Sequence, residues 1–144
     1  MSNEKNKVMT LHDAIAKYVH DGDHIVMGGF VTHRRPVAAA YEIIRQGIKD
    51  LVYESAGGAM DGDLLIGAGC VKILLESYMA NSGYTQVCRR MRHAIEAGEL
   101  MFEDYSLDVQ PIQYHAAALG SPYIPIKNML GSDLEDKWGI PAEE

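Results

Sequence analysis

The sequence has few of the residues and segments that mark several common classes of protein. Only two of its 144 residues are cysteine, Cys70 and Cys88, and they lack CxxC spacing, so neither a metal site nor a disulfide framework is expected. No apolar run approaches the ~20 residues that a membrane span needs. Residues 1–8 are polar and contain no apolar stretch of signal-peptide length. We therefore expect a cytoplasmic protein with reduced thiols.

Basic residues are also in the minority. The chain has 13 lysines and arginines against 20 aspartates and glutamates, which gives a formal net charge of −7. Proteins that bind nucleic acid normally carry a basic surface, so nucleic acid is not an expected partner, and neither is a membrane. With 47% hydrophobic and 23% charged residues, the composition is that of a globular domain with a buried core.

Short apolar segments alternate with helical patterns along the chain. Thr10 with Asp13 predicts the capped start of a first helix, and Ser106 predicts the cap of the last. This alternation, at intervals of about 25 residues, predicts an open, mainly parallel α/β sheet with helices on both faces, in one domain over residues 1–144. The pattern weakens after Gly131, which indicates a loop or an incomplete element there. The predicted strands are 24–27, 51–55, 71–78 and 100–104, and the predicted later helices are 36–47, 61–66, 85–97 and 107–119.

The loops that follow the strands are the expected place for a ligand, because helix N-termini and turns meet at the carboxyl edge of a parallel sheet. The first of these loops begins with Gly28, Gly29 and Phe30. Paired glycines let backbone N–H groups approach a ligand and hold an oxyanion or a phosphate. The alternative is a tight turn that serves packing alone.

Charged and hydroxyl side chains supplement these loops. Arg34 and Arg35 follow the glycines, where a guanidinium could bind a substrate carboxylate or a phosphate; ordinary surface charge is the alternative. Glu103, at the end of the fourth predicted strand, is the candidate base or hydrogen-bond acceptor. Ser55 offers a hydroxyl at the end of the second strand.

Residues 21–30 together with Pro36 resemble the first signature of the family I coenzyme A transferases. That signature consists of Asp-Gly, two residues, three apolar residues, Gly-Gly-Phe, three residues, a glycine, one residue and a proline. Every fixed position matches except Arg34, which stands at the signature's later glycine. The resemblance covers nearly the whole chain and is to A (alpha) subunits of the glutaconate CoA-transferase type. The other stretches that carry it are 7–11, 80–83, 103–106, 115–120 and 138–140.

The resemblance implies a CoA-transferase-like fold and a transfer of CoA between an acyl-CoA and a carboxylic acid, here a dicarboxylic acid. Such enzymes use ping-pong chemistry through a glutamyl-CoA thioester. The glutamate lies in a Ser-Glu-Asn-Gly-like motif of the B (beta) subunit, and this chain has no such motif. The chain would be the N-terminal part of an A subunit in a hetero-oligomer, with the CoA thioester as substrate and no permanently bound cofactor. The implied substrate-binding and CoA-binding residues are Gly28, Gly29, Phe30, Arg34, Arg35, Ser55 and Ser82.

Two alternatives stay open from the sequence. A CoA-thioester hydrolase subunit could use the same scaffold, with Glu103 as the important acid. The chain could also be a short, non-catalytic assembly or binding paralogue, because the nucleophile is absent and Arg34 replaces a glycine.

Overall fold

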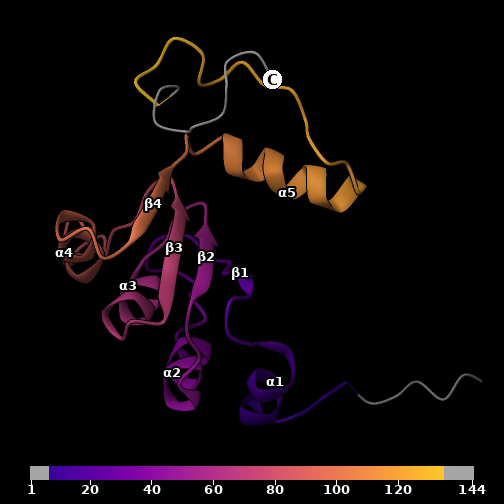
Figure 1. Cartoon of the computed structure of the whole chain (residues 1–144), viewed down its shortest axis with the longest axis vertical. Coiled ribbons are helices and arrows are strands. Elements are labelled where there is room, and N and C mark those ends of the chain that lie inside the picture. Colours follow the sequence, from indigo (N-terminus) through magenta and orange to yellow (C-terminus); the bar gives the residue numbers. More distant parts are fainter. Residues whose placement is uncertain (1–6, 135–144) are drawn as a thin grey trace, which may run out of the picture.

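The computed structural model describes residues 7–134 and has one four-stranded parallel sheet at its centre (Figure 1). The strands are β1 (His24–Val26), β2 (Leu51–Ser55), β3 (Val71–Glu76) and β4 (Met101–Asp104), and they lie side by side in sequence order. All three neighbouring pairs are parallel, so the four carboxyl ends meet at one edge. The predicted open parallel α/β sheet is confirmed.

The helices are distributed unequally over the two faces of the sheet. Their bounds are α1 (Leu11–Tyr18), α2 (Val37–Gln46), α3 (Met60–Gly67), α4 (Arg89–Glu96) and α5 (Val109–Leu119). Right-handed crossovers between strands that follow one another in one direction place every crossover helix on the same face. Accordingly α1, α2, α3 and α4 pack in sequence as one layer, and α5 lies apart from it near the carboxyl ends of the strands (Figure 1). The second face therefore has only partial helical cover in the described part of the chain.

Side chains on the two faces differ in burial as this arrangement requires. Tyr53 and Leu74 are register partners on the face that α2 to α4 cover, and both are fully buried. On the other face, Val26 is 54% exposed and Met101 is 58% exposed. Large apolar side chains that are half exposed at both edges of one sheet face show where α5 does not reach. No helix among residues 7–134 has both the length and the apolar composition needed to span a membrane.

Several element boundaries follow the sequence pattern and others do not. Thr10 caps α1 as predicted, since its hydroxyl accepts a hydrogen bond from the Asp13 N–H at 3.1 Å. Ser106 does not cap α5: the N-cap position is Asp108, and the Ser106 hydroxyl bonds to the Asp108 carboxylate instead. The third strand and the helix after it are both shorter than predicted, because residues 77–88 form a loop between β3 and α4.

A carboxylate from a different element satisfies the N-terminus of α4. Asp63 in α3 accepts hydrogen bonds from the backbone N–H groups of Arg90 and Met91 at 2.9 and 3.0 Å. The side chain of Cys88, at the N-cap position, makes no capping bond. Unpaired N–H groups at a helix start favour an anion, so Asp63 replaces the missing local cap and fixes α4 against α3.

Candidate functional site

The loop after β1 is joined to the loop after β2 at the carboxyl edge of the sheet. Phe30 and His33 exchange backbone hydrogen bonds of 3.0 and 2.9 Å, which closes a small turn. The Val31 N–H donates to the Gly57 carbonyl at 2.8 Å, and Val31 is buried. The two loops therefore form one unit, and the position of the glycines depends on both.

Gly29 has a backbone conformation that no other residue could adopt without strain. Its φ is +106°, and a Cβ there would stand 2.7 Å from the Arg34 carbonyl oxygen and 2.8 Å from the His33 carbonyl oxygen. Gly28 and Gly29 are both exposed. Within residues 7–134, no acceptor receives the backbone N–H of either glycine. Two unpaired donors at the carboxyl edge are available to a ligand.

Arg34 is also in the left-handed region, with φ of +57°. Glycine is the residue that tolerates this conformation, which explains why the family signature has a glycine at this position. The Arg34 side chain is exposed, and no carboxylate or carbonyl pairs with its guanidinium in the part of the chain that the structure describes. Of the two adjacent arginines, Arg34 is the one whose charge faces solvent.

Arg35 was expected to face a ligand, but its guanidinium lies inside the protein. Its side chain is 1% exposed, and it forms an ion pair with Asp61, whose side chain is fully buried. Nε donates to Asp61 Oδ1 and a terminal nitrogen donates to Asp61 Oδ2, both at 2.7 Å. This two-pronged arrangement matches the planar guanidinium to the carboxylate. Because Asp61 takes these donors in the interior, Arg35 is not available to a substrate carboxylate in this structure.

Residues of β2 complete the surroundings of Arg35. Its terminal nitrogens donate to the Tyr53 hydroxyl at 2.5 Å, to Ser55 Oγ at 3.0 Å and to the Gly57 carbonyl at 3.4 Å. Ser55 was a candidate substrate contact, but it is 1% exposed and its hydroxyl faces Arg35. Burial lowers the pKa of Arg35, but the Asp61 hydrogen bond and the nearby negative charges together raise it above the ordinary value.

Glu76 lies beneath the second glycine pair, Gly57 and Gly58, and is 1% exposed. Its Oε1 accepts the N–H groups of Ser77 and Tyr78 at 3.2 and 3.4 Å. Its Oε2 has no hydrogen-bond partner among the described residues and lies where a Cβ on Gly58 would overlap it. Burial raises the pKa of Glu76 to about 8, although the backbone N–H groups and Arg35 act in the opposite direction.

Glu103, the candidate base, lies on the other face of the sheet from Tyr53 and Leu74. Its row of register partners runs through Leu75 to Glu54. The Tyr105 hydroxyl donates to Glu103 Oε2 at 2.9 Å. Glu54 is buried, and its Oε2 lies 2.7 Å from the Nε2 of His24. Glu103 is on β4, and β2 and β3 lie between it and β1, the strand that leads into the Gly28-Gly29 loop.

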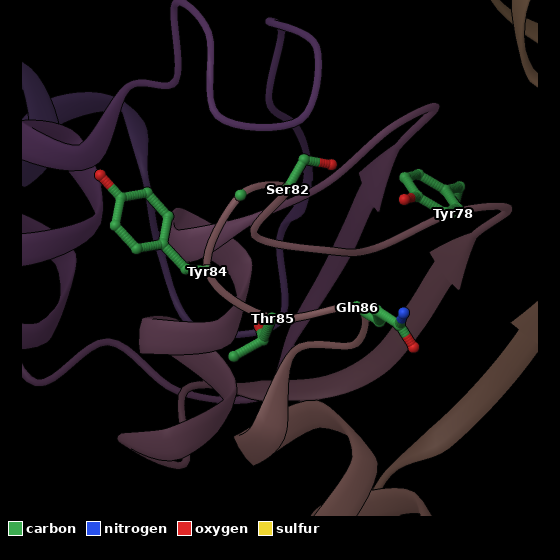
Figure 2. Close-up of a pocket in the computed structure, with 6 residues that line it drawn as sticks. Tyr78, Ser82, Tyr84, Thr85 and Gln86 are labelled. Atoms are coloured by element: carbon green, nitrogen blue, oxygen red, sulfur yellow. The ribbon is translucent and has the colours of Figure 1, made fainter.

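Ser82 lies in the loop between β3 and α4, where it helps to line an open hollow of about 360 Å³. Figure 2 shows the Tyr78 and Tyr84 side chains on opposite sides of this loop, with Ser82 between them. Tyr84 is 85% exposed. The hollow is lined by Tyr78, Ser82, Gly83, Tyr84, Thr85 and Gln86, and these residues do not include the Arg35 cluster.

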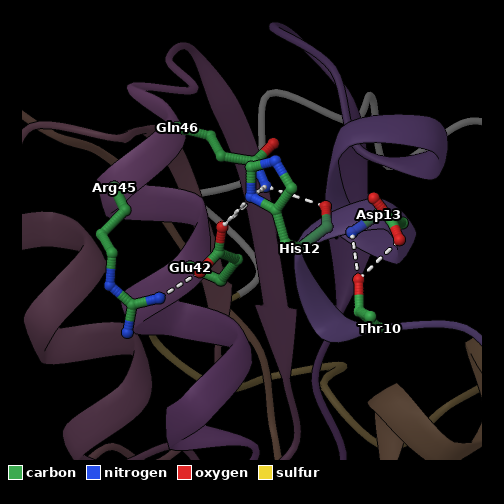
Figure 3. Close-up of polar contacts among 6 residues, drawn as sticks. All are labelled: Thr10, His12, Asp13, Glu42, Arg45 and Gln46. Carbon is green, nitrogen blue, oxygen red and sulfur yellow. Dashed lines mark hydrogen bonds and ion pairs between the residues drawn. The ribbon is translucent and has the colours of Figure 1, made fainter.

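A separate polar cluster joins α1 to α2 on the helical layer (Figure 3). The buried Glu42 accepts from the Gln46 side-chain amide at 2.8 Å and lies 2.9 Å from the Nδ1 of His12. Arg45 forms an ion pair with the other oxygen of Glu42. These contacts lower the pKa of Glu42, chiefly through the Gln46 and His12 hydrogen bonds. The cluster holds two helices together and contains no residue of the glycine loops.

No motif in the sequence points to Tyr53, Asp61 or Glu76 as members of this cluster. Each was marked by a polar group in an otherwise apolar element: Tyr53 in a buried central strand, Asp61 in the short apolar α3, and Glu76 at the end of an apolar strand. A polar side chain at a position whose neighbours are all buried indicates a paired interior group. That signal shows that a partner exists but does not say which one.

Comparison with known proteins agrees with this architecture. The sequence profile described as coenzyme A transferase matches residues 8–143. The chain belongs to the coenzyme A transferase family.

Relatives of this coenzyme A transferase chain include named A subunits. The A subunit of glutaconate CoA-transferase from Acidaminococcus fermentans is 56% identical over 138 residues, which cover 96% of this chain and 43% of that protein. The A subunit of 3-oxoadipate CoA-transferase from Pseudomonas knackmussii is 39% identical over 131 residues, covering 89% of this chain and 46% of that protein. The chain thus spans less than half the length of these relatives.

The fold is that of a solved member of the family. The crystal structure of glutaconate coenzyme A-transferase from Acidaminococcus fermentans superposes with a TM-score of 0.89 at 57% identity. The superposition covers 93% of this chain and 42% of that one. The predicted family and α/β fold are confirmed.

Proposed function

We propose that this chain is part of the A subunit of a glutaconate-type CoA-transferase, which moves CoA between an acyl-CoA and a (di)carboxylic acid. A B subunit supplies the nucleophilic glutamate in this proposal, since the chain itself has no Ser-Glu-Asn-Gly-like motif. Residues 1–144 correspond to a single N-terminal domain of the A subunit, in a cytoplasmic hetero-oligomer. The CoA thioester is a substrate, and no cofactor is bound permanently. Similarity to the two named A subunits supports the proposal.

The observation that carries the chemistry is the pair of unpaired N–H groups on Gly28 and Gly29. When the partner's carboxylate attacks a thioester carbonyl, the C=O electron pair moves to oxygen and a negative charge develops there. Backbone donors that are already in place stabilise such a charge without reorganising, and removal of one oxyanion donor typically slows acyl transfer by about 10²- to 10³-fold. In this proposal the exposed glycine loop is the oxyanion site, and the partner positions the attacking group beside it.

Arg34 is the residue proposed to select a dicarboxylic acyl group. Its guanidinium is the exposed cation next to the glycine loop, and it can pair with the carboxylate remote from the reacting thioester. A non-glycine residue kept at φ of +57° stores strain, and such strain is concentrated at functional positions. Phe30, which is 54% exposed, offers an apolar wall on the same loop, and Ser82 offers a hydroxyl at the neighbouring hollow.

The test is a CoA-exchange assay on the full-length chain with its co-purified partner subunit. Transfer requires an acceptor acid, so no CoA is released when the acceptor is left out. Acceptor-independent CoA release would instead establish a hydrolase, the second candidate function, for which the Tyr105-bound Glu103 is the acid to replace. If the chain purifies alone as a self-associated species with no affinity for a B-type subunit, it is a non-catalytic module.

Arg34→Gln is the variant that tests the specificity assignment. We expect the KM for a dicarboxylic acceptor to rise about 10-fold or more, because a charge-assisted bond is worth about 1.5–3 kcal/mol. The KM for a monocarboxylic acceptor of similar length should change little, and Arg92→Gln provides the matched control on exposed α4. Equal KM changes for both acceptors would exclude Arg34 from carboxylate recognition.

A further inference from the structure

The buried arginine beside the glycine loop connects three separate parts of the carboxyl edge. Arg35 itself belongs to the loop after β1, Ser55 and Gly57 belong to the end of β2 and its loop, and Asp61 belongs to α3. The guanidinium contacts all of them, with distances of 2.7 Å to each Asp61 oxygen and 3.0 Å to Ser55 Oγ. Few single side chains in the described chain have hydrogen bonds to so many elements.

The same side chain is in close contact with the strained part of the loop. A Cβ on Gly29 would lie 2.9 Å from Arg35 Cδ, so the arginine stem packs directly against this glycine. Arg34, the residue before it, has φ of +57°, and the turn between Phe30 and His33 precedes that. Arg35 is six residues after Gly29 in the sequence, so the contact of its stem with Gly29 is made through space, and this contact is the direct link between the guanidinium and the glycine pair.

Stability alone does not account for an ion pair at this place. Replacing a buried ion pair by apolar side chains of similar volume is often neutral or stabilising, because both charges must be removed from water. A bidentate guanidinium–carboxylate pair provides something different, namely one fixed distance and one fixed plane. The Tyr53 hydroxyl accepts from Arg35 and donates to Asp61 Oδ2 at 3.0 Å, so it is a further partner of the same carboxylate oxygen.

We infer that Asp61, acting through Arg35, is a positioning residue that sets the direction of the Gly28 and Gly29 N–H groups. Neither Asp61 nor Arg35 touches the reacting atoms. The inference rests on the proposed oxyanion function of the glycines. The effect of Asp61 on the order of the loop, however, does not depend on that function. A misplacement of about 1 Å at an oriented donor can lower a rate by about 10²-fold, which is the scale of effect expected here.

Hydrogen exchange on the intact protein tests whether Asp61 orders the loop, without any activity measurement. The amides of Phe30, Val31 and His33 are hydrogen-bonded and report the position of the loop. Asp61→Asn removes the charge but keeps the shape of the side chain. We expect exchange at these three amides to accelerate about 10-fold or more while the amides of β2 and β3 remain protected. Unchanged exchange at the three amides would overturn the inference, whatever the enzyme's activity.

A double variant separates positioning from simple stabilisation. Arg35→Met with Asp61→Leu removes both charges and keeps an apolar core, so Tm should return to about the parent's value. If the pair positions the loop, fast exchange at residues 30–33 and a kcat lowered about 10²-fold should persist in the double variant, with acceptor KM changed far less. Recovery of kcat together with Tm would show that the pair only stabilises the fold. Arg92→Met, which removes an exposed arginine paired with Glu96, is the control, and it should leave exchange and kcat unchanged.

If the parent complex shows no CoA transfer at all, the proposed function fails. The exchange measurements then still decide whether Asp61 orders the loop, so the two failures can be distinguished.

Discussion

The most direct physical prediction concerns the buried carboxyl of Glu76. Its side chain is 1% exposed, and Oε2 has no hydrogen-bond partner among residues 7–134. Burial raises its pKa from an ordinary 4.5 to about 8, despite the opposing effect of the nearby Gly58, Tyr78 and Ser77 N–H groups and of the Arg35 charge. Glu76 is therefore protonated in the folded protein at neutral pH, whereas the same group is ionised in the unfolded chain.

The sign and size of the effect follow from this difference in pKa. Between pH 4.5 and about 8 the folded state binds a proton that the unfolded state has released, so the free energy of unfolding falls as pH rises through this window. The group's contribution is most favourable below pH 4.5. A shift of this size corresponds to at most about 5 kcal/mol, at about 1.4 kcal/mol for each pKa unit. Glu76→Gln, which cannot ionise, lacks this pH dependence.

Urea unfolding of the parent and of Glu76→Gln at pH 5 and pH 8 measures the effect. We expect the stability of the variant relative to the parent to increase by about 3–4 kcal/mol between the two pH values. Glu99→Gln, at an exposed position, should show no such change. If the difference between Glu76→Gln and the parent is the same at pH 5 and pH 8, the carboxyl is ionised in the folded protein and the reasoning is refuted.

Three further substitutions test other parts of the fold. Gly29→Ala should lower the free energy of unfolding by about 1–3 kcal/mol in urea titrations, because φ of +106° and two carbonyl oxygens oppose a Cβ. Asp63→Ala should remove the cap of α4, lower stability by about 1–2 kcal/mol and speed amide exchange at Arg90 and Met91; unchanged exchange there would contradict the capping role. Glu42 has a lowered pKa because Gln46 and His12 bind its ionised form, so its stabilisation is present above pH 4.5 and disappears as pH falls below it. Glu42→Gln should thus be less stable than the parent in thermal scans at pH 7 and match it near pH 3.

The fold could be predicted from the sequence because its signals are local. Each strand is a short apolar run, and the turn or helix that follows begins with a glycine, a proline or a capping residue. Gly47, which ends α2 in the left-handed conformation, is an example of a boundary that depends on one residue and its own backbone. The boundaries that were wrong depend on distant partners: α4 begins at Arg89 because a carboxylate from α3 caps it.

The sequence draws attention to the backbone of the first loop more clearly than to the side chains around it. The Gly28-Gly29 pair is visible as a motif, and the positive φ at positions 29 and 34 agrees with it. The destination of Arg35 could not be foreseen, since Asp61 is 26 residues away in sequence and becomes a neighbour only when α3 packs on the sheet. Adjacent arginines look alike in a sequence, and it is the pairing with the buried Asp61 that distinguishes Arg35 from the exposed Arg34.

Asp61 and Asp63 in α3 and Glu76 at the end of β3 are three of the buried carboxyl groups, and an unbalanced negative charge on any of them would oppose an anion at the glycine loop. Asp61 is neutralised by Arg35, Asp63 is compensated by the N-terminus of α4, and Glu76 remains protonated. An uncompensated charge about 10 Å from an oxyanion would oppose it by about 1.7 kcal/mol at an effective dielectric constant near 20, which is more than a 10-fold loss of rate.

Raising the pH above about 8 should create that charge, because Glu76 then ionises. In the CoA-exchange assay, kcat of the parent should therefore fall on the alkaline side while kcat of Glu76→Gln does not, and at pH 7 the two proteins should be equal. A parallel alkaline decline in both would mean that a group other than Glu76 sets it. The buried acids would then act on the stability of the loop but not on the charge that develops above it.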